Sequence, residues 1–174
     1  MNSLAYKIAV SIKNANPEET HSVETMQYSL GIILNTLLII VGTAIISFSL
    51  GRFSECMTFL LCFCILRLSS GGFHLKTTLA CNIVTIFLST VLPSFITLSN
   101  SILWIANVFN LIIIVTFAPN PDRNTRIPAS IYPLLKLVSI AMVSSNFFLQ
   151  STVIGLAFLV QSLTVIPWTR RRTQ

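Results

Sequence analysis

LGIILNTLLIIVGTAIISFSL, residues 30–50, contains no charged side chain. An α-helix of roughly 20 apolar residues is long enough to cross the hydrocarbon core of a bilayer. The rest of the chain has the same character, because 53% of its 174 residues are hydrophobic and only 9% are charged. Soluble domains carry roughly 25% charged residues. The sequence therefore predicts an integral membrane protein with an all-α fold.

Further apolar runs follow the first one, and the chain length leaves room for at most about six spans. The run at 53–66 is short enough to be either a crossing or a re-entrant segment. We favour a crossing, because Arg67 and Lys76 follow it and basic residues are retained on the cytoplasmic side. Pro93 is expected to kink the third segment. The expected membrane segments are residues 30–50, 53–66, 75–98, 101–118, 131–150 and 151–167.

The two ends of the chain carry the polar residues of the predicted bundle. Residues 3–15 place apolar and polar side chains on opposite helix faces, which predicts an amphipathic helix in the membrane interface. Asn16 and Pro17 are expected to start a second helix, as its N-cap and first residue. The fold expected is a polytopic helical bundle with about six hydrophobic segments, some short or kinked. It forms a single domain, 1–174, with cytoplasmic-face amphipathic helices at 1–29, a transmembrane bundle at 30–167 and a basic cytoplasmic tail at 168–174.

The basic residues predict the orientation. Of the 11 Lys and Arg residues, Arg52 alone falls on the side opposite the N-terminus if the chain crosses six times. The positive-inside rule then predicts a multi-pass protein of the cell membrane with both termini in the cytoplasm. Nucleic acid is not an expected partner, since the basic residues lie beside apolar runs and do not gather on one polar segment.

A second stretch, RLSSGGFHLKTTLAC at residues 67–81, interrupts the apolar sequence. It places His74 and Cys81 within one short segment. A thiolate is a strong nucleophile and imidazole accepts a proton near neutral pH, so these are the residue types of a cysteine nucleophile and its general base. A lone histidine at an interface or a lone cysteine in an apolar helix is also common without a catalytic role. The two residues alone leave both interpretations open.

The other three cysteines, Cys56, Cys62 and Cys64, lie within one apolar run and are predicted to be packing residues. On a helix, Cys62 and Cys64 point about 200° apart, so they do not converge on one metal ion. We therefore expect no metal site and no cofactor. Two polar residues of the last segments, Asn146 and Gln161, are predicted to hold helices together by hydrogen bonds.

The pattern of Arg67, Gly71-Gly72, His74 and Cys81 resembles the signature R-x3-GG-x-H-x6-C of the accessory gene regulator B (AgrB) family, the membrane-embedded cysteine endopeptidases of Gram-positive quorum sensing. Two further stretches are similar to the same family. They are ETMQYSLGIIL at residues 24–34 and the central loop that contains Ala118-Pro119 and Ile127-Pro128. The resemblance covers residues 20–135.

The resemblance implies a role for each motif residue. Cys81 would be the nucleophile and His74 the base in the cleavage of an AgrD-like precursor peptide, through a thioester that closes to a thiolactone or lactone ring. Arg67, Lys76 and the glycine pair would bind the substrate or shape the site, although topology explains the two basic residues equally well. The expected partners are this precursor and the lipid bilayer, with a homodimer as one candidate assembly.

The separation of His74 from Cys81 limits how the pair can meet. In one straight helix they would lie about 10.5 Å apart along the axis, whereas proton transfer needs roughly 2.6–3.2 Å. We therefore expect the helix to begin after His74, with Cys81 about two turns inside the apolar segment and the glycine pair folding the loop back. Backbone amides at the helix start are the expected oxyanion donors. The candidates for orienting the imidazole are Glu24, Glu55, Ser69, Ser70 and a backbone carbonyl.

Two other classes of function remain open at this point. A small transporter or channel subunit would line a path with polar residues of the spans, although no intramembrane pair of charged residues marks an ion route. A non-enzymatic membrane scaffold would deliver a partner peptide. Cleavage of a co-expressed precursor distinguishes the peptidase from both. The polar residues available to a path are Asn35, Asn107, Asn110 and Asn146.

Overall fold

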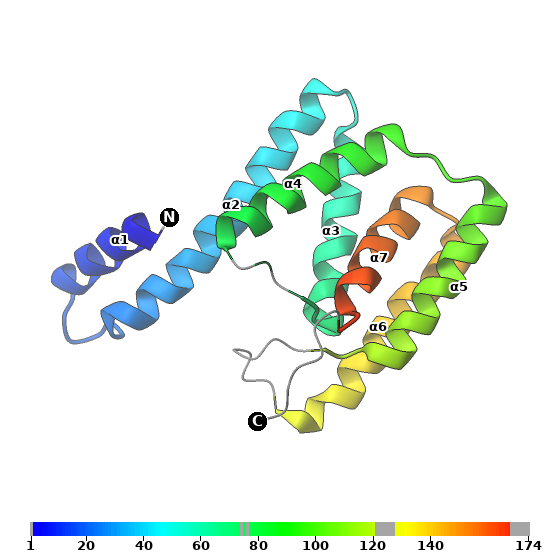
Figure 1. Ribbon diagram of the computed structural model, residues 1–174. Coiled ribbons are helices and arrows are strands. Elements are labelled where there is room, and N and C mark those ends of the chain that lie inside the picture. The colour runs from blue at the N-terminus through cyan, green and yellow to red at the C-terminus, as the bar shows by residue number, and fades with distance from the viewer. Residues whose placement is uncertain (1, 74, 76, 121–127, 168–174) are drawn as a thin grey trace.

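The computed structural model of the chain is a helical bundle (Figure 1) and describes residues 2–73, 75, 77–120 and 128–167. A short 3-10 helix, η1 (Ala129–Ile131), precedes the sixth α-helix. The predicted all-α, polytopic fold is confirmed. The helices are α1 (Asn2–Ala15), α2 (Val23–Ser49), α3 (Phe53–Ser70), α4 (Thr78–Phe95), α5 (Asn100–Phe117), α6 (Tyr132–Leu149) and α7 (Thr152–Val165).

Five of these helices, α2 to α6, are long and apolar enough to cross a membrane. The run expected at 53–66 continues to Ser70, so α3 has 18 residues and reaches the length of a span. The short helix is α7, whose 14 residues extend about 21 Å against a hydrocarbon core of roughly 30 Å. The prediction of about six hydrophobic segments, some of them short, is confirmed for the described part of the chain.

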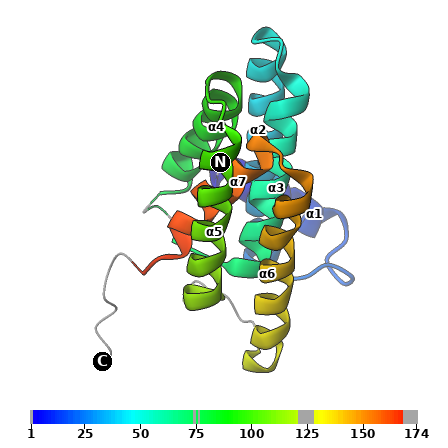
Figure 2. The ribbon, with the colours of Figure 1, turned by 90° about the vertical axis from the view of Figure 1, so that its right-hand side faces the viewer.

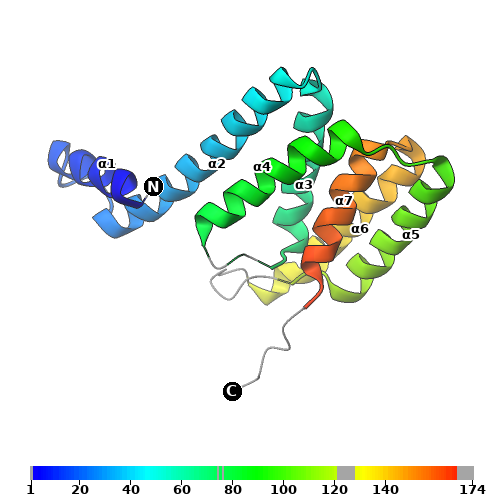
Figure 3. The same cartoon turned by 45° about the horizontal axis from the view of Figure 1, so that its top comes forward.

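The short helix α7 is also the most enclosed one. It packs against α3, α4, α5 and α6, and Figures 1 and 3 both place it between α3 and the α5–α6 pair. Phe158 and Val165 of α7 join Leu66 of α3 and Ile114 of α5 in one apolar cluster. A short, partly polar helix is tolerated here because neighbouring helices cover it and can satisfy its polar groups.

Polar side chains connect α7 and α6 to α5. Asn146 of α6 donates to the Asn107 side-chain oxygen of α5 at 3.0 Å, and Asn110 of α5 donates to the Gly155 carbonyl at 3.4 Å. A Cβ on Gly155 would lie 2.5 Å from Leu103 Cδ1, so this glycine lets α5 and α7 approach closely. These contacts agree with the packing role predicted for Asn146.

Two more helix pairs complete the bundle, the parallel pair α2 with α4 and the antiparallel pair α5 with α6. Figure 2 shows α5 and α6 running side by side. Between α2 and α4, the Thr43 and Ser89 hydroxyls lie 3.2 Å apart and Asn82 donates to Asn35 at 3.1 Å. Pro93 is buried inside α4, which continues to Phe95.

The helix α1 lies against the first half of α2, away from the rest of the bundle (Figure 1). Its Ala5 and Ala9 are fully buried there. The prediction that Asn16 starts a second helix is wrong, because residues 17–19 form a turn and α2 begins at Val23. Ser22 is the N-cap of α2 and its hydroxyl accepts the Thr25 N–H at 3.3 Å. The helix therefore starts six residues after the predicted cap.

The helices from α2 to α7 alternate in direction. In Figure 1 the α2–α3, α4–α5 and α6–α7 connections lie at one end of the bundle. The ends of α3, α5 and α7 and the start of α6 lie at the other end. An even number of passes returns the chain to its starting side, so this arrangement is compatible with the prediction that both termini are cytoplasmic.

Cysteine labelling tests the orientation. In a background in which the four native cysteines are alanine, single cysteines at Asn100 and Gln150 are expected to react with a membrane-impermeant maleimide added outside the cell. A cysteine at Ala129 is expected to react only after permeabilisation, because it lies at the end of the bundle that carries Arg67. Labelling of Ala129 from outside would reverse the assigned orientation.

Candidate active site

The motif loop, residues 71–77, begins where α3 ends. Gly71 caps α3 with φ 70° and ψ −149°, and Gly72 follows with φ 135°. Residues with a side chain rarely adopt these conformations, so the glycine pair allows the chain to leave the helix and turn. A Cβ on Gly72 would lie 2.6 Å from Thr164 Oγ1 and 3.2 Å from the Thr164 carbonyl oxygen. The glycine therefore also allows the loop to lie directly against the end of α7.

Backbone hydrogen bonds join the motif loop to two segments that are distant in the sequence. The Gly72 N–H donates to the Asn120 carbonyl, and the Asn120 N–H donates to the Ser70 carbonyl, both at 2.9 Å. The Phe73 N–H donates to the Thr164 carbonyl at 2.7 Å. The Asn120 side chain donates to a carbonyl at the end of α7 at 2.9 Å. The loop, the residues after α5 and the end of α7 thus form one hydrogen-bonded unit.

The side chain of Arg67 belongs to the same unit. Its Nη2 donates to the Phe73 carbonyl at 2.7 Å, and its Nη1 lies 3.3 Å from Gln161 Oε1 and 3.4 Å from Thr164 Oγ1. The guanidinium also lies over the Phe63 ring, 5.8 Å from its centre. These contacts make Arg67 part of the framework that shapes the motif loop.

Cys81 lies in the first turn of α4 and is partly buried. Thr77 caps this helix, since its hydroxyl accepts the Ala80 N–H at 3.2 Å and its carbonyl accepts the Cys81 N–H at 3.1 Å. The thiol therefore lies one turn inside the helix. The position predicted from the sequence is deeper, about two turns inside the apolar segment. The amides of Thr78 and Leu79 belong to the same first turn, where N–H groups have no intrahelical acceptor. This end of the helix also carries a partial positive charge.

His74 and Lys76 lie outside the described residues. The helix that carries Cys81 begins at Thr78, so the prediction that it starts after His74 is confirmed. The axial separation of about 10.5 Å that one continuous helix would impose on His74 and Cys81 therefore does not apply.

Three of the groups predicted to orient the imidazole have other partners in the structure. Ser69 and Ser70 are buried, and each hydroxyl donates to a carbonyl of its own helix. Glu55 lies in the first turn of α3, at the end opposite the motif loop, and pairs with Arg52 at 3.0 Å. The prediction is wrong for Glu55, because it lies at the far end of α3. Ser69 and Ser70 already have partners, and a contact of either with His74 stays a prediction. Glu24, in the first turn of α2, and a backbone carbonyl also remain as candidates.

The other cysteines occupy three different environments on α3. Cys56 is buried, with its Sγ 3.5 Å from Ser94 Oγ, and Cys62 packs beside the apolar core. Cys64 is exposed on the bundle surface, so the prediction that it packs inside is wrong. Cys64 points about 200° away from Cys62 around the helix axis, so when Cys62 faces the core Cys64 faces outward. Among the described residues, no group of three or more His, Cys, Asp or Glu side chains lies close enough to hold a metal ion.

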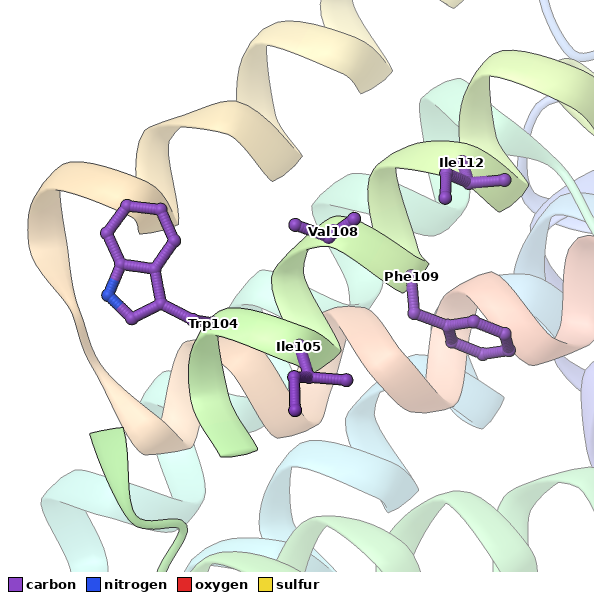
Figure 4. A pocket seen from close by; sticks show the side chains of 5 residues that line it. All are labelled: Trp104, Ile105, Val108, Phe109 and Ile112. Atoms are coloured by element: carbon purple, nitrogen blue, oxygen red, sulfur yellow. The ribbon is translucent and has the colours of Figure 1, made fainter. Parts of the chain in front are cut away.

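A hollow of about 410 Å³ lies on the outer face of α5 (Figure 4). All of its lining side chains come from this one helix, so it is an open apolar surface and not an enclosed site. Such a surface suits contact with lipid chains. We assign no part of the site to it. The lining residues are Trp104, Ile105, Val108, Phe109 and Ile112.

Sequence patterns assign neither Asn120 nor Thr164 to the site, and assign Gln161 only to helix packing. The one local signal is the spacing of Gln161 and Thr164, two polar residues three positions apart on an apolar helix, which places them on one face. No sequence signal indicates that this face meets the motif loop.

Comparisons with known proteins agree with the motif. The sequence model of the family described as Accessory gene regulator B matches residues 3–168. The chain is 28% identical over 159 residues to the accessory gene regulator protein B of Staphylococcus aureus (strain bovine RF122 / ET3-1), covering 83% of this chain and 84% of that protein. It is 30% identical over 105 residues to an AgrB-like protein of Halalkalibacterium halodurans, covering 59% of this chain and 51% of that protein. No solved structure matches it. The chain belongs to the accessory gene regulator B family and is thus a component of the accessory gene regulator system.

Proposed function

We propose that this chain is a membrane-embedded cysteine endopeptidase that cleaves an AgrD-like precursor peptide and supports its cyclisation. One observation carries the proposal. In a chain of this family, Cys81 lies partly buried in the first turn of α4, directly after the loop that contains His74. A thiol at a helix N-terminus has unpaired amides beside it, which suit the stabilisation of a negatively charged intermediate.

The proposed reaction has two stages. His74 takes the proton of the Cys81 thiol, and the thiolate attacks the carbonyl carbon of one precursor peptide bond. The tetrahedral intermediate collapses to a thioester, and the protonated imidazole gives its proton to the departing amine. A thiol or hydroxyl within the retained fragment then attacks the thioester carbonyl. A thiolactone or lactone ring forms, and Cys81 leaves as a thiol with the proton that the attacking group gives up.

Cyclisation competes with hydrolysis of the thioester, so water must be kept from Cys81. Partial burial of Cys81 and the position of α4 beside α2 and α3 support this requirement. Amides of Thr78 and Leu79 are the proposed oxyanion donors.

The remaining assignments concern the substrate and the assembly. Since Arg67 already bonds to Phe73 and α7, we assign it to loop shape, and we assign Lys76 to an acidic segment of the precursor. We assign both chain ends, including the basic tail at 168–174, to the cytoplasmic side by the positive-inside rule, so that a newly made precursor would reach the loop directly. The chain acts as one domain, and a homodimer is the assembly to test first.

The transporter interpretation loses its support in the described residues. Asn107 and Asn146 bond to each other, and Asn35 bonds to Asn82. Side chains that satisfy one another in this way join helices and do not line a path.

Reconstitution tests the proposed activity. The purified chain in liposomes, mixed with a synthetic AgrD-like precursor, is expected to produce a shortened fragment and a cyclic product that mass spectrometry identifies by loss of water relative to the linear fragment. Empty liposomes are the control. Movement of intact precursor across the bilayer without cleavage would favour the transporter, and binding without either event would favour the scaffold.

A further inference from the structure

Gln161 of α7 is fully buried, and both polar atoms of its side-chain amide have partners. Its Nε2 donates to the Gly71 carbonyl at 2.6 Å and to Ser70 Oγ at 3.0 Å. Its Oε1 accepts from Arg67 at 3.3 Å and lies 3.1 Å from Thr164 Oγ1, whose one hydrogen it shares with the Gln161 backbone carbonyl at 2.7 Å. A primary amide has two donors, so both are used, and its oxygen has two neighbouring donors.

One of the two donor contacts satisfies the Gly71 carbonyl, which the conformation of the glycine pair turns away from the helix. With φ 70° and ψ −149°, Gly71 leaves the helical path, and its carbonyl no longer points along the hydrogen-bond ladder of α3. An unpaired carbonyl in a membrane bundle is costly because water is scarce there. The neighbouring Ser70 carbonyl is already bonded to Asn120. Gln161 therefore supplies the donor that the glycine conformation requires.

The acceptor contacts extend this support to the far side of the glycines. The guanidinium of Arg67 reaches Gln161 Oε1 with one nitrogen and the Phe73 carbonyl with the other. Gln161 thus holds Gly71 directly and Phe73 through Arg67. The peptide unit at Phe73 leads directly into His74, so its orientation sets where residue 74 begins.

From this arrangement we propose that Gln161 is a positioning residue, which presents the segment carrying His74 to Cys81 from a helix more than 80 residues away in the sequence. Its side-chain hydrogen bonds are to Ser70, Gly71, Arg67 and Thr164, and not to the Cys81 thiol. The role rests on the proposed function in one respect: it affects catalysis only if His74 acts on Cys81.

Three variants test the proposal in the full chain reconstituted in liposomes. Gln161→Leu keeps the volume and removes all four contacts, while Gln161→Glu keeps the acceptors for Arg67 and Thr164 and loses the amide donors. Asn110→Leu is the matched control, because Asn110 is also fully buried and bonds to α7, at the Gly155 carbonyl. Misplacement of a catalytic group by about 1 Å lowers rates by roughly 100-fold. We expect kcat for the precursor to fall by about 10- to 100-fold in both Gln161 variants with KM unchanged.

The control and a second measurement separate positioning from general destabilisation. Asn110→Leu is expected to keep the parental kcat per folded molecule, and amide hydrogen exchange at Gly72 and Phe73 is expected to accelerate in both Gln161 variants but not in Asn110→Leu. Parental kcat in both Gln161 variants, or an equal loss in Asn110→Leu, would overturn the proposal. If the parent chain does not cleave the precursor, the proposed function fails, and the exchange rates alone decide whether Gln161 holds the loop: unchanged exchange would refute it.

Discussion

Replacing Cys81 with alanine is expected to abolish precursor cleavage while the chain still inserts and still binds the precursor. The substitution deletes only the sulfur that becomes acylated, and alanine at this partly buried position in the first turn of α4 favours the helix. Removal of the nucleophile from a catalytic dyad or triad lowers kcat by roughly 10⁴-fold or more. Gel mobility of the co-expressed precursor measures cleavage, and co-purification measures binding.

Two controls make this result specific. Cys81→Ser is expected to lose nearly all activity as well, because a hydroxyl is a much weaker nucleophile than a thiolate. The triple variant of Cys56, Cys62 and Cys64 to alanine is expected to stay active, and thiol alkylation is then expected to inactivate it through Cys81 alone. Retained cleavage by Cys81→Ala would contradict the proposed peptidase function. The transporter and the scaffold would then be the functions left to test.

Replacing Gly72 with valine is expected to produce the second largest loss, to roughly 1% of the parental kcat or less. A side chain at φ 135° is strained, and its Cβ would lie 2.6 Å from Thr164 Oγ1 and 3.2 Å from the Thr164 carbonyl oxygen. A β-branched residue therefore forces the loop away from α7 and breaks the Phe73–Thr164 hydrogen bond. Cleavage per inserted molecule is the quantity to measure.

Gly31→Val is the matched control for this substitution. Gly31 lies in α2, and a Cβ built on it meets no atom within 4 Å. This variant is expected to insert and cleave at the parental rate, apart from a small change in helix propensity. Normal cleavage by Gly72→Val would show that the loop does not need its close approach to α7.

Much of the fold could be predicted from the sequence because the spans are long and uncharged. The apolar runs correctly indicate α4, α5, α6 and α7 to within a few residues, and they give the end of α2 but not its start. The end of α3 was predicted too early, since an apolar run excludes Arg67, Ser69 and Ser70, whereas the helix continues and buries both serines at the bundle end. The start of α2 was misplaced because Asn16 was expected to be the N-cap, whereas the helix is capped by Ser22, six residues further on.

The candidate site was predictable only where its residues are close in sequence. The glycine pair indicates a sharp turn, and its positive φ values agree with that prediction. The partners of the turn, Asn120 and Gln161, come from segments roughly 50 and 90 residues away, and hydrophobic periodicity carries no information about such contacts. Only the packed bundle brings them to the loop.

A thioester at Cys81 is the central chemical claim, and mass spectrometry of the acid-quenched reaction tests it most directly. The chain is mixed with a precursor whose internal thiol or hydroxyl is blocked, so that ring closure cannot consume the intermediate. The peptide that contains Cys81 is predicted to carry the N-terminal precursor fragment, bound through a linkage that neutral hydroxylamine cleaves. Precursor cleavage without any such adduct, or with the adduct on another residue, would contradict the assignment of Cys81 as the nucleophile.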